Sequence, residues 1–319
     1  MPRSHDVLGK EGMSKYRAIL IAGPTASGKS QLALDIAEKI NGIIVNADSM
    51  QVYEDLSILT ARPSSADLAH APHALYGFVP GDRPYSVGQY VHDAERVIGE
   101  CLEGGHMPIL VGGTGLYFRA LLDGLSPIPP IPRSIRQHWR SEAARLGAEQ
   151  LHLVLTARDR EMAARLEATD KQRIVRALEV LDATGQSLAD WQRIPGVPVL
   201  PSEATVKIVI DTEREVLYRN CENRFDNMLA SGALDEVARL AAKNFDESLP
   251  IMRALGVQPL LAHLRGRIDL ATAVDTTKVE TRHYIKRQLT WLKSNMIAWN
   301  WIEAQQMQSL TDNILPIVN

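Results

Sequence analysis

Residues 23–30 constrain the fold of this chain more than any other feature. They read Gly-Pro-Thr-Ala-Ser-Gly-Lys-Ser, with an apolar run at residues 18–22 before them and a helical pattern at residues 31–37 after them. This spacing between a strand and a helix is typical of a phosphate-binding loop, in which backbone N–H groups and a helix N-terminus surround an anion. We predict that phosphate groups are bound by Gly23, Pro24, Thr25, Ala26, Ser27, Gly28, Lys29 and Ser30, and that the Ser30 hydroxyl holds a Mg²⁺ ion.

Composition sets the limits of the other predictions. The 319 residues are 45% hydrophobic, which is enough for a substantial core and two lobes, and no apolar run is long enough to cross a membrane. Residues 1–16 lack the apolar stretch of a secretory signal, so we expect a disordered lead, or a native start at Met13, and a cytoplasmic protein. Cys101 and Cys221 are isolated, which fits a reducing compartment. Because the net charge is −3, a nucleic-acid site would have to be a local patch.

Short apolar runs alternate with helical patterns in much of the chain. We predict strands at residues 17–22, 42–47, 107–111 and 206–210, and helices at residues 29–40 and 116–122. The order favours an α/β fold, a parallel sheet flanked by helices as in P-loop NTPases. Functional groups in such sheets gather at the carboxyl ends of the strands, where Asp48 and Thr114 follow two of them.

A helical segment interrupts this pattern. Two proline clusters, at residues 126–132 and 195–201, bracket predicted helices at residues 133–146, 158–168 and 170–184, the last ended by Gly185. We therefore predict a core domain of residues 17–126 and 204–319 with an all-helical insertion domain at residues 127–203. After Thr212 the pattern is helical to about Asn300.

The residues by themselves leave the chemistry open. A kinase or ATPase of this class usually has a second acid at a strand end, but the strand at residues 107–111 is followed by Gly112, Gly113 and Thr114. This weakens the prediction of ATP hydrolysis, although Asp48 or Asp211 could serve. From position alone, Asp48 fits a cap of the next turn as well as it fits a catalytic group.

A basic segment lies near the end of the predicted helical region. Residues 282–293 contain Arg282, His283, Lys286, Arg287 and Lys293 without an acid between them. A charged helix face is usually only solvated, but such a run in an acidic protein is the local patch that RNA binding requires.

Several motifs in order resemble the tRNA dimethylallyltransferases, also called tRNA isopentenyltransferases, of the compact bacterial type. The matching segments are residues 23–30, 46–53, 111–117, 125–127, 170–180, 282–293 and, within the last, 288–292. The resemblance implies transfer of a dimethylallyl group from dimethylallyl diphosphate to the exocyclic amine of the adenosine 3′ to the anticodon. It also implies tRNA as the partner, extrusion of the target base, Mg²⁺ as the cofactor and, as we expect, a monomer.

The resemblance assigns roles to individual residues. Asp48 becomes the general base, Thr114 a polar contact at the reacting centre and Arg136 a group that steadies the diphosphate. From sequence alone, Thr114 could equally cap a helix and Arg136 could be solvated surface. The implied tRNA contacts are Asp48, Ser49, Met50, Gln51, Gln172, Arg173, Ile174, Val175, Arg176, Arg253, Ala254, Leu255, Gly256, Val257, Gln258, Arg282, Lys286 and Arg287.

The chain departs from the family pattern at a few positions. Leu59 stands where the family has Gly, Arg62 where it has Lys, and Gln258 where many members have a second basic residue. Leu59 puts the local turn geometry in question, and Gln258 weakens one RNA contact.

Three other functions compete with tRNA modification: an isopentenyltransferase acting on free adenine nucleotides, an ATP-dependent small-molecule kinase, and a noncatalytic nucleotide-binding module. The helical insertion and the basic segment favour tRNA, because a mononucleotide needs no such extended surface.

Overall fold

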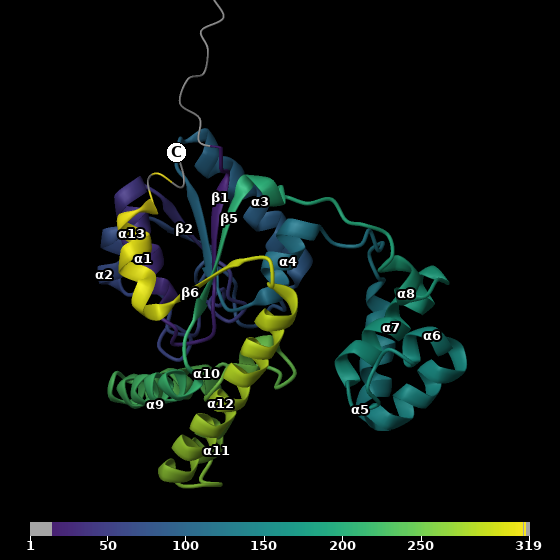
Figure 1. Ribbon diagram of the computed structural model, residues 1–319. Helices are drawn as coiled ribbons and strands as arrows, with labels where there is room; N and C mark the ends of the chain where they lie inside the picture. Colours follow the sequence, from purple (N-terminus) through teal and green to yellow (C-terminus); the bar gives the residue numbers. More distant parts are fainter. Residues whose placement is uncertain (1–14, 315, 317–319) are drawn as a thin grey trace, which may run out of the picture. The chain divides into compact units, whose positions relative to one another are not determined.

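A parallel β-sheet is the centre of the computed structural model, which describes residues 15–314 and 316. In this part of the chain the sheet has six strands in the order β3-β2-β4-β1-β5-β6, and every pairing is parallel (Figure 1). The strands are β1 (Ala18–Ala22), β2 (Ile43–Asn46), β3 (His73–Ala74), β4 (Pro108–Gly112), β5 (Thr205–Asp211) and β6 (Asn300–Glu303). The predicted α/β fold with a parallel sheet flanked by helices is therefore confirmed.

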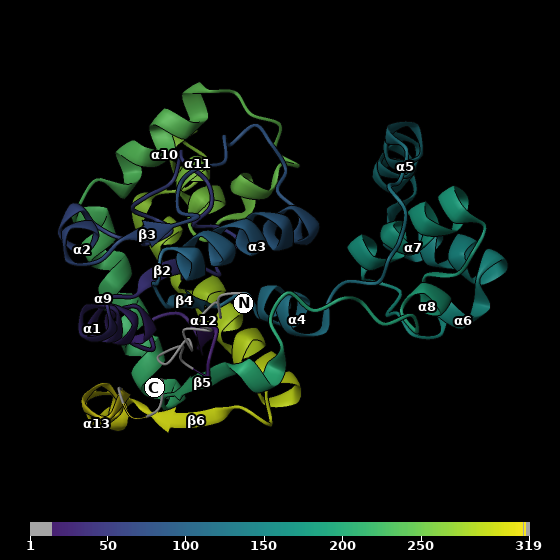
Figure 2. The ribbon, with the colours of Figure 1, turned by 90° about the horizontal axis from the view of Figure 1, so that it is seen from above.

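Helices cover both faces of the sheet. The α-helices are α1 (Lys29–Ile40), α2 (Ser65–His70), α3 (Val87–Glu103), α4 (Gly115–Asp123), α5 (Arg133–Arg158), α6 (Arg160–Ala163), α7 (Lys171–Thr184), α8 (Leu188–Trp191), α9 (Arg214–Ala230), α10 (Ala233–Ala242), α11 (Val257–Leu264), α12 (Leu270–Asn295) and α13 (Met307–Asp312). Short 3-10 helices are η1 (Ser202–Ala204), η2 (Pro250–Arg253) and η3 (Ala304–Gln306). Figures 1 and 2 show α1 and α13 on one face of the sheet and α3 and α4 on the other.

The alternation of side chains along β1 explains this layering. Successive residues of a strand point to opposite faces, so Ile19 and Ile21 pack with α1, whereas Ala18 and Leu20 pack with α3 and α4. All five residues of β1 are buried, as expected for a central strand covered on both faces.

A third group of helices lies beyond the carboxyl ends of the strands, at the bottom of Figure 1. Helices α9, α10 and α11 pack on the segment after β2 around Val52, Tyr53 and Leu56. The carboxylate of Glu236 on α10 accepts hydrogen bonds from the backbone N–H groups of Ser57, Ile58 and Leu59. These contacts hold that segment next to the end of the sheet.

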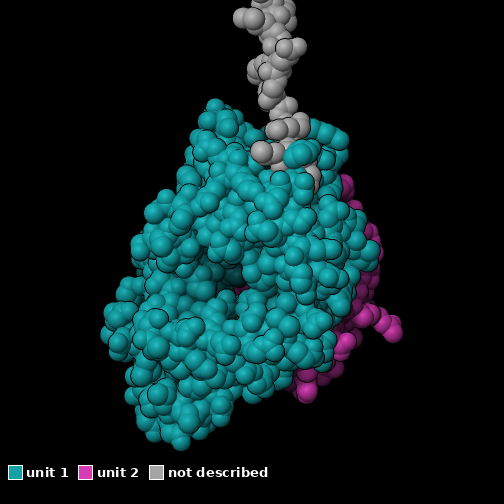
Figure 3. Space-filling model, turned by 60° about the vertical axis from the view of Figure 1, so that its left-hand side comes forward, with its two compact units in different colours: residues 1–122, 199–319 teal, residues 123–198 magenta. Residues whose placement is uncertain are grey.

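The chain divides into two compact units, coloured separately in Figure 3. Unit 1 comprises residues 1–122 and 199–319, and unit 2 comprises residues 123–198, which form their own core around Trp139, Leu151 and Ile174. At the end of α4, the Leu121 carbonyl accepts hydrogen bonds from the N–H groups of Val199 and Leu200, at 2.9 and 3.0 Å. The chain thus leaves and re-enters unit 1 at one place.

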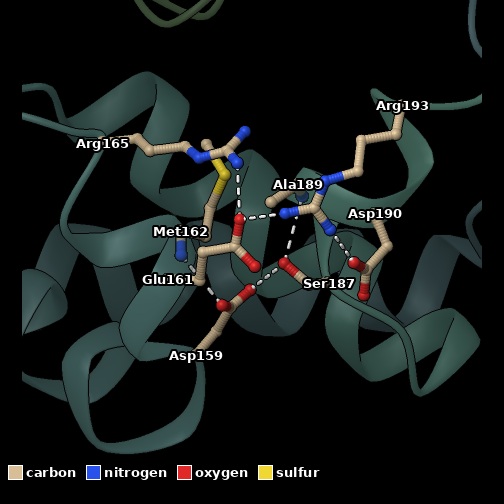
Figure 4. Close-up of polar contacts among 8 residues, drawn as sticks. All are labelled: Asp159, Glu161, Met162, Arg165, Ser187, Ala189, Asp190 and Arg193. Carbon is tan, nitrogen blue, oxygen red and sulfur yellow. Dashed lines mark hydrogen bonds and ion pairs between the residues drawn. The ribbon is translucent and has the colours of Figure 1, made fainter.

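The helix predicted at residues 158–168 is wrong. Helix α5 runs to Arg158 across a break at Gly147, whose φ is 80°, and α6 covers only Arg160–Ala163. Asp159 separates them because its Oδ1 accepts a hydrogen bond from the N–H of Met162 at 2.9 Å, which caps α6. Its Oδ2 accepts a hydrogen bond from the Ser187 hydroxyl, at the start of α8 (Figure 4).

Two further features differ from the sequence prediction. The region after Thr212 is interrupted by η2 and by turns at Gly232 and Gly256, and it is followed by a strand, β6, that was not predicted. The predicted disordered lead lies outside the described residues except for Lys15 and Tyr16. Within residues 15–314 and 316, every helix is too short or too polar to be a candidate membrane span.

Candidate active site

The loop of residues 23–30 connects β1 to α1. Gly28 has φ 89°, a left-handed conformation that favours glycine, at the N-cap of α1. A Cβ atom on Gly23 would lie 2.8 Å from the Ser27 Oγ, so the turn has no room for a side chain there. The two glycines therefore allow the tight curve that the sequence pattern predicts.

Lys29 lies inside this loop. Its Nζ donates a hydrogen bond to the carbonyl of Pro24 at 3.1 Å. Burial lowers the pKa of Lys29 to about 8; the charge of Asp48 opposes this shift and that of Arg224 adds to it. A half-buried cation that lies close to a second cation is suited to binding an anion.

Two serine hydroxyls complete the loop. The Ser27 Oγ is buried and has no hydrogen-bond partner among the described residues. Ser30 is exposed at the start of α1 and lines a cavity of about 110 Å³ together with Gln51, Arg62 and Tyr76. Figure 3 shows the face of unit 1 hollowed near its middle.

The donors near the loop fit a magnesium ion that is only partly held by protein. Within residues 15–314 and 316, no group of three or more His, Cys, Asp or Glu side chains could hold a metal. Mg²⁺ usually keeps several waters and binds through one or two protein oxygens plus substrate phosphates. The Ser30 hydroxyl and the unpartnered Ser27 hydroxyl are oxygens of this kind, so the loop fits the ion only together with a bound diphosphate.

Asp48 follows β2 at the carboxyl edge of the sheet. Its Oδ1 accepts a hydrogen bond from the Met50 N–H at 2.9 Å, and its own N–H donates to Asn46 Oδ1 at 2.8 Å. Among the described residues, no hydrogen bond is recorded to Oδ2. Asp48 therefore caps its turn through Oδ1, which is one of the two alternatives left open by the sequence; its catalytic role stays a prediction.

Thr114 follows β4 and lies next to Asp48 in this edge. Its Oγ1 accepts a hydrogen bond from the Ser49 N–H at 2.9 Å and donates one to the Ser49 hydroxyl at 3.3 Å. A Cβ on Gly112 would lie 2.0 Å from the Ala47 carbonyl oxygen, so glycine permits the close approach of the two strand ends. The Thr114 hydroxyl thus holds Ser49, the residue after Asp48. Asp211, the other acid that the sequence analysis considered, ends β5 on the other side of β1.

Several residues at this edge were missed by the sequence analysis. The Arg224 guanidinium on α9 donates a hydrogen bond to the Thr25 hydroxyl of the loop. Burial raises the pKa of Tyr76, Tyr117 and Tyr284, and the charge of Asp48 raises it further. Arg224 and Tyr76 lie outside the segments that match the family. Tyr117 and Tyr284 lie within two of those segments, but the motifs gave no sign of their position near Asp48.

The predicted RNA contacts are not all on the surface. Ile174, Ala254 and Val257 are buried in hydrophobic cores, so their side chains are not available to RNA, and only their backbones could meet it. Leu255 and Val175 are half-buried, whereas Arg253, Gln258, Gln172 and Arg173 are exposed. The positive φ in this region belongs to Ala61 and not to Leu59, so the leucine there causes no backbone strain.

Arginines in unit 2 surround one acidic side chain. Burial raises the pKa of Glu179, and the charges of Arg176, Arg136 and Arg140 act against this rise. Arg136 lies on α5 and Arg176 on α7, while Arg173 pairs with Asp170 at 2.9 Å. The three arginines around Glu179 outnumber its single negative charge, so this cluster has a net positive charge.

The basic residues after position 280 all lie on α12. Arg282, Lys286, Arg287 and Lys293 are exposed, whereas Ile285, Leu289 and Leu292 are buried. Residues 282–293 contain no acid, but acids lie near them. Arg282 forms an ion pair with Glu222 of α9. Burial raises the pKa of Glu280 on α12 itself, and the charges of Arg287 and His283 act against this rise.

The sheet topology and the loop geometry together define a class: an α/β phosphate-binding protein with a carboxylate at a strand end near the loop. Sequence comparison identifies the family within this class. The model of the IPP transferase family matches residues 51–295, and that of isopentenyl transferases matches residues 16–75. The chain belongs to the IPP transferase family.

Individual relatives agree with this assignment. The chain is 51% identical over 290 residues to a tRNA dimethylallyltransferase of Bradyrhizobium sp., covering 91% of this chain and 95% of the relative. It is 50% identical over 292 residues to one of Beijerinckia indica, covering 92% and 97%.

Solved structures give the same result. The tRNA isopentenylpyrophosphate transferase of Bacillus halodurans superposes with a TM-score of 0.67 at 29% identity, covering 94% of this chain and 96% of the other. A eukaryotic dimethylallyltransferase acting on tRNA superposes with a TM-score of 0.79 at 25% identity, covering 94% and 77%. The predicted family and P-loop NTPase-like fold are thus confirmed.

Proposed function

We propose that this protein transfers the dimethylallyl group of dimethylallyl diphosphate to the exocyclic amine of the adenosine 3′ to the anticodon in tRNA. One observation carries the proposal: a carboxylate, Asp48, lies close enough to Lys29 of the phosphate-binding loop to affect its pKa, and no carboxylate ends β4. The names of the bacterial relatives support the same reaction.

The loop would act on a leaving group. Breaking the bond between the allylic carbon and diphosphate leaves the electron pair on the diphosphate oxygen, so positive charge near that oxygen lowers the barrier. Lys29 and Arg224 are the cations at the loop, and the N-terminus of α1 adds its partial positive charge. We propose that Ser30 holds a Mg²⁺ ion, which when bound would neutralise further charge on the diphosphate.

Asp48 would act on the nucleophile. The exocyclic amine of adenine is a weak nucleophile because its lone pair is delocalised into the ring. As the nitrogen bonds to the allylic carbon it must lose a proton, and the Asp48 carboxylate oxygen without a hydrogen bond in the structure is the acceptor we propose. Thr114 supports this role by holding the neighbouring Ser49.

We also propose that the protein works as a monomer in the cytoplasm, where tRNA is modified. Its two cysteines, Cys101 and Cys221, are free thiols, which suits a reducing compartment. Light scattering of the purified protein, alone and with tRNA, tests the oligomeric state.

Transfer of label tests the function directly. The protein is incubated with labelled dimethylallyl diphosphate and either tRNA or AMP, and ATP turnover is measured separately. We expect label in tRNA alone. Label in AMP alone would identify the nucleotide-modifying alternative, and ATP-dependent phosphorylation without prenyl transfer would identify a kinase.

The Asp48→Asn substitution tests the proposed base. We expect kcat to fall roughly 100-fold or more, since asparagine cannot accept the proton, with tRNA affinity nearly unchanged. Asn keeps the oxygen that accepts the Met50 N–H, so the turn stays formed. Loss of tRNA binding in proportion to activity would mean that Asp48 mainly anchors the RNA.

A further inference from the structure

The side-chain amide of Gln288 joins two segments of the candidate site. Its Oε1 accepts a hydrogen bond from the Thr25 N–H in the phosphate-binding loop at 3.0 Å. Its Nε2 donates a hydrogen bond to the Gly113 carbonyl at 3.2 Å, in the turn that carries Thr114. Gln288 is 6% exposed, and it comes from α12, far from both segments in the sequence.

The rest of the same helix face packs against the same two segments. Ile285 and Leu289 form a small core that includes Ala26 of the loop. Trp291 covers Gly115, where a Cβ atom would lie 2.0 Å from the indole ring. About two turns of α12, residues 285–291, therefore contact both the loop after β1 and the turn after β4.

Packing alone does not account for an amide at this position. Burying an amide is costly unless both its ends are hydrogen-bonded, and an apolar side chain would fill the same space without that requirement. Here both ends are satisfied, each by the backbone of a different segment. The amide therefore fixes the distance between the two segments more narrowly than apolar contacts would.

We infer that Gln288 is a positioning residue. It fixes the part of the site that holds dimethylallyl diphosphate relative to the part that holds the adenine. This rests on the proposed function, in which the loop holds the diphosphate and the edge containing Asp48 and Thr114 holds the adenine amine. Because Gln288 occupies the Thr25 N–H, it also orients the first part of the loop. A displacement of either half would slow the transfer, since reactions of this kind depend steeply on alignment.

Two substitutions separate positioning from packing. Gln288→Met keeps the length of the side chain and removes both hydrogen bonds. Gln288→Glu keeps the acceptor for the Thr25 N–H but, when ionised, cannot donate to Gly113 and adds a negative charge beside the loop. Thr290→Val is the matched control, because Thr290 lies on the same helix, is exposed, and donates its hydroxyl hydrogen bond to the Lys286 carbonyl within α12.

Each variant is measured for its melting temperature, its affinity for inorganic diphosphate with Mg²⁺, and its KM and kcat for dimethylallyl diphosphate with saturating tRNA. We expect Gln288→Met to weaken diphosphate binding and to lower kcat, each roughly tenfold, the scale of losing a buried hydrogen-bonded contact. Gln288→Glu should weaken diphosphate binding further through charge repulsion, and Thr290→Val should match the wild type.

A purely structural role predicts a different result. If Gln288→Met lowers only the melting temperature and keeps both the diphosphate affinity and kcat of the wild type, the inference is overturned. The two proposals can fail separately. A wild-type protein that binds diphosphate but transfers nothing to tRNA would disprove the proposed function, and the diphosphate affinity of Gln288→Met would still decide the role of Gln288.

Discussion

The surroundings of Lys29 shift its pKa in both directions. Burial lowers its pKa, Asp48 raises it and Arg224 lowers it, with a result of about 8. The unfolded chain keeps its lysine protons to higher pH, so this residue makes folding of the ligand-free protein more favourable as pH rises above about 8. An anion in the loop would reverse the shift by favouring the charged ammonium.

The pH dependence of diphosphate binding follows from this shift. We expect the affinity of the wild type for inorganic diphosphate to fall as pH rises through about 8, because binding requires protonated Lys29. Calorimetric titration across this range measures it. Lys29→Arg is the control, since arginine stays charged and leaves only the titration of diphosphate itself. An identical pH profile in the two proteins would contradict the prediction.

Residues differ in how far the sequence could predict them. The positions of Gly23, Lys29 and Asp48 in the fold were predictable because they depend on local spacing or on the end of a strand, while the catalytic role of Asp48 stays a prediction. Arg224 and Gln288 reach the loop from 199 and 263 residues away, and only the packing of α9 and α12 brings them there. A single sequence contains no local signal for such contacts.

Helix α12 has two faces with separate tasks. Its buried face contacts the loop and the turn after β4, and its exposed face presents Lys286, Arg287 and Lys293. Arg282 and Lys278 are paired with acids on α9, so their charges are partly neutralised. Within the described part of the chain, Lys286 and Lys293 form no ion pair, so we expect them to be the stronger candidates for phosphate contacts.

A comparison of two lysines on this helix tests the RNA surface. Lys286→Ala should weaken tRNA binding and make its salt dependence shallower by about one released counterion. Lys278→Ala is the matched control, because Lys278 pairs with Asp226 at 2.7 Å. Binding measured over a range of salt concentrations gives both slopes. Equal slopes for the two variants would exclude Lys286 from the RNA contact.

Element boundaries were predictable where a local cap sets them. Helix α1 spans Lys29–Ile40 as predicted, and α7 ends before Gly185, whose φ is 69°. The helix predicted at residues 158–168 was wrong because α5 continues to Arg158, the Asp159 side chain caps a new helix, and that helix, α6, ends at Ala163. The four-residue edge strand β6 was missed because half of its residues are exposed and its apolar pattern is weak.

At the scale of the molecule, the chain leaves unit 1 for unit 2 and returns to it at one place. The sheet and its flanking helices belong to unit 1, and the Leu121 carbonyl already meets the N–H groups of Val199 and Leu200. The proline clusters suggested that a segment is inserted between α4 and β5. Where that segment leaves and re-enters unit 1 depends on these hydrogen bonds, which no sequence pattern specifies.

Replacing residues 123–198 with a short Gly/Ser linker tests the contribution of unit 2. We expect a folded protein that still binds inorganic diphosphate through the loop of residues 23–30, while tRNA affinity falls about tenfold or more with the loss of phosphate contacts. Arg173→Ala with Arg176→Ala in the full chain is the milder control and should reproduce part of that loss. Unchanged tRNA affinity of the shortened protein would exclude unit 2 from RNA recognition.

The paired backbone at Leu121, Val199 and Leu200 has a consequence for how such proteins diversify. Any stretch of chain whose two ends meet there can be lengthened, shortened or exchanged without altering the register of a strand. We expect the inserted helices to tolerate such changes while the carboxyl edge of the sheet keeps its geometry.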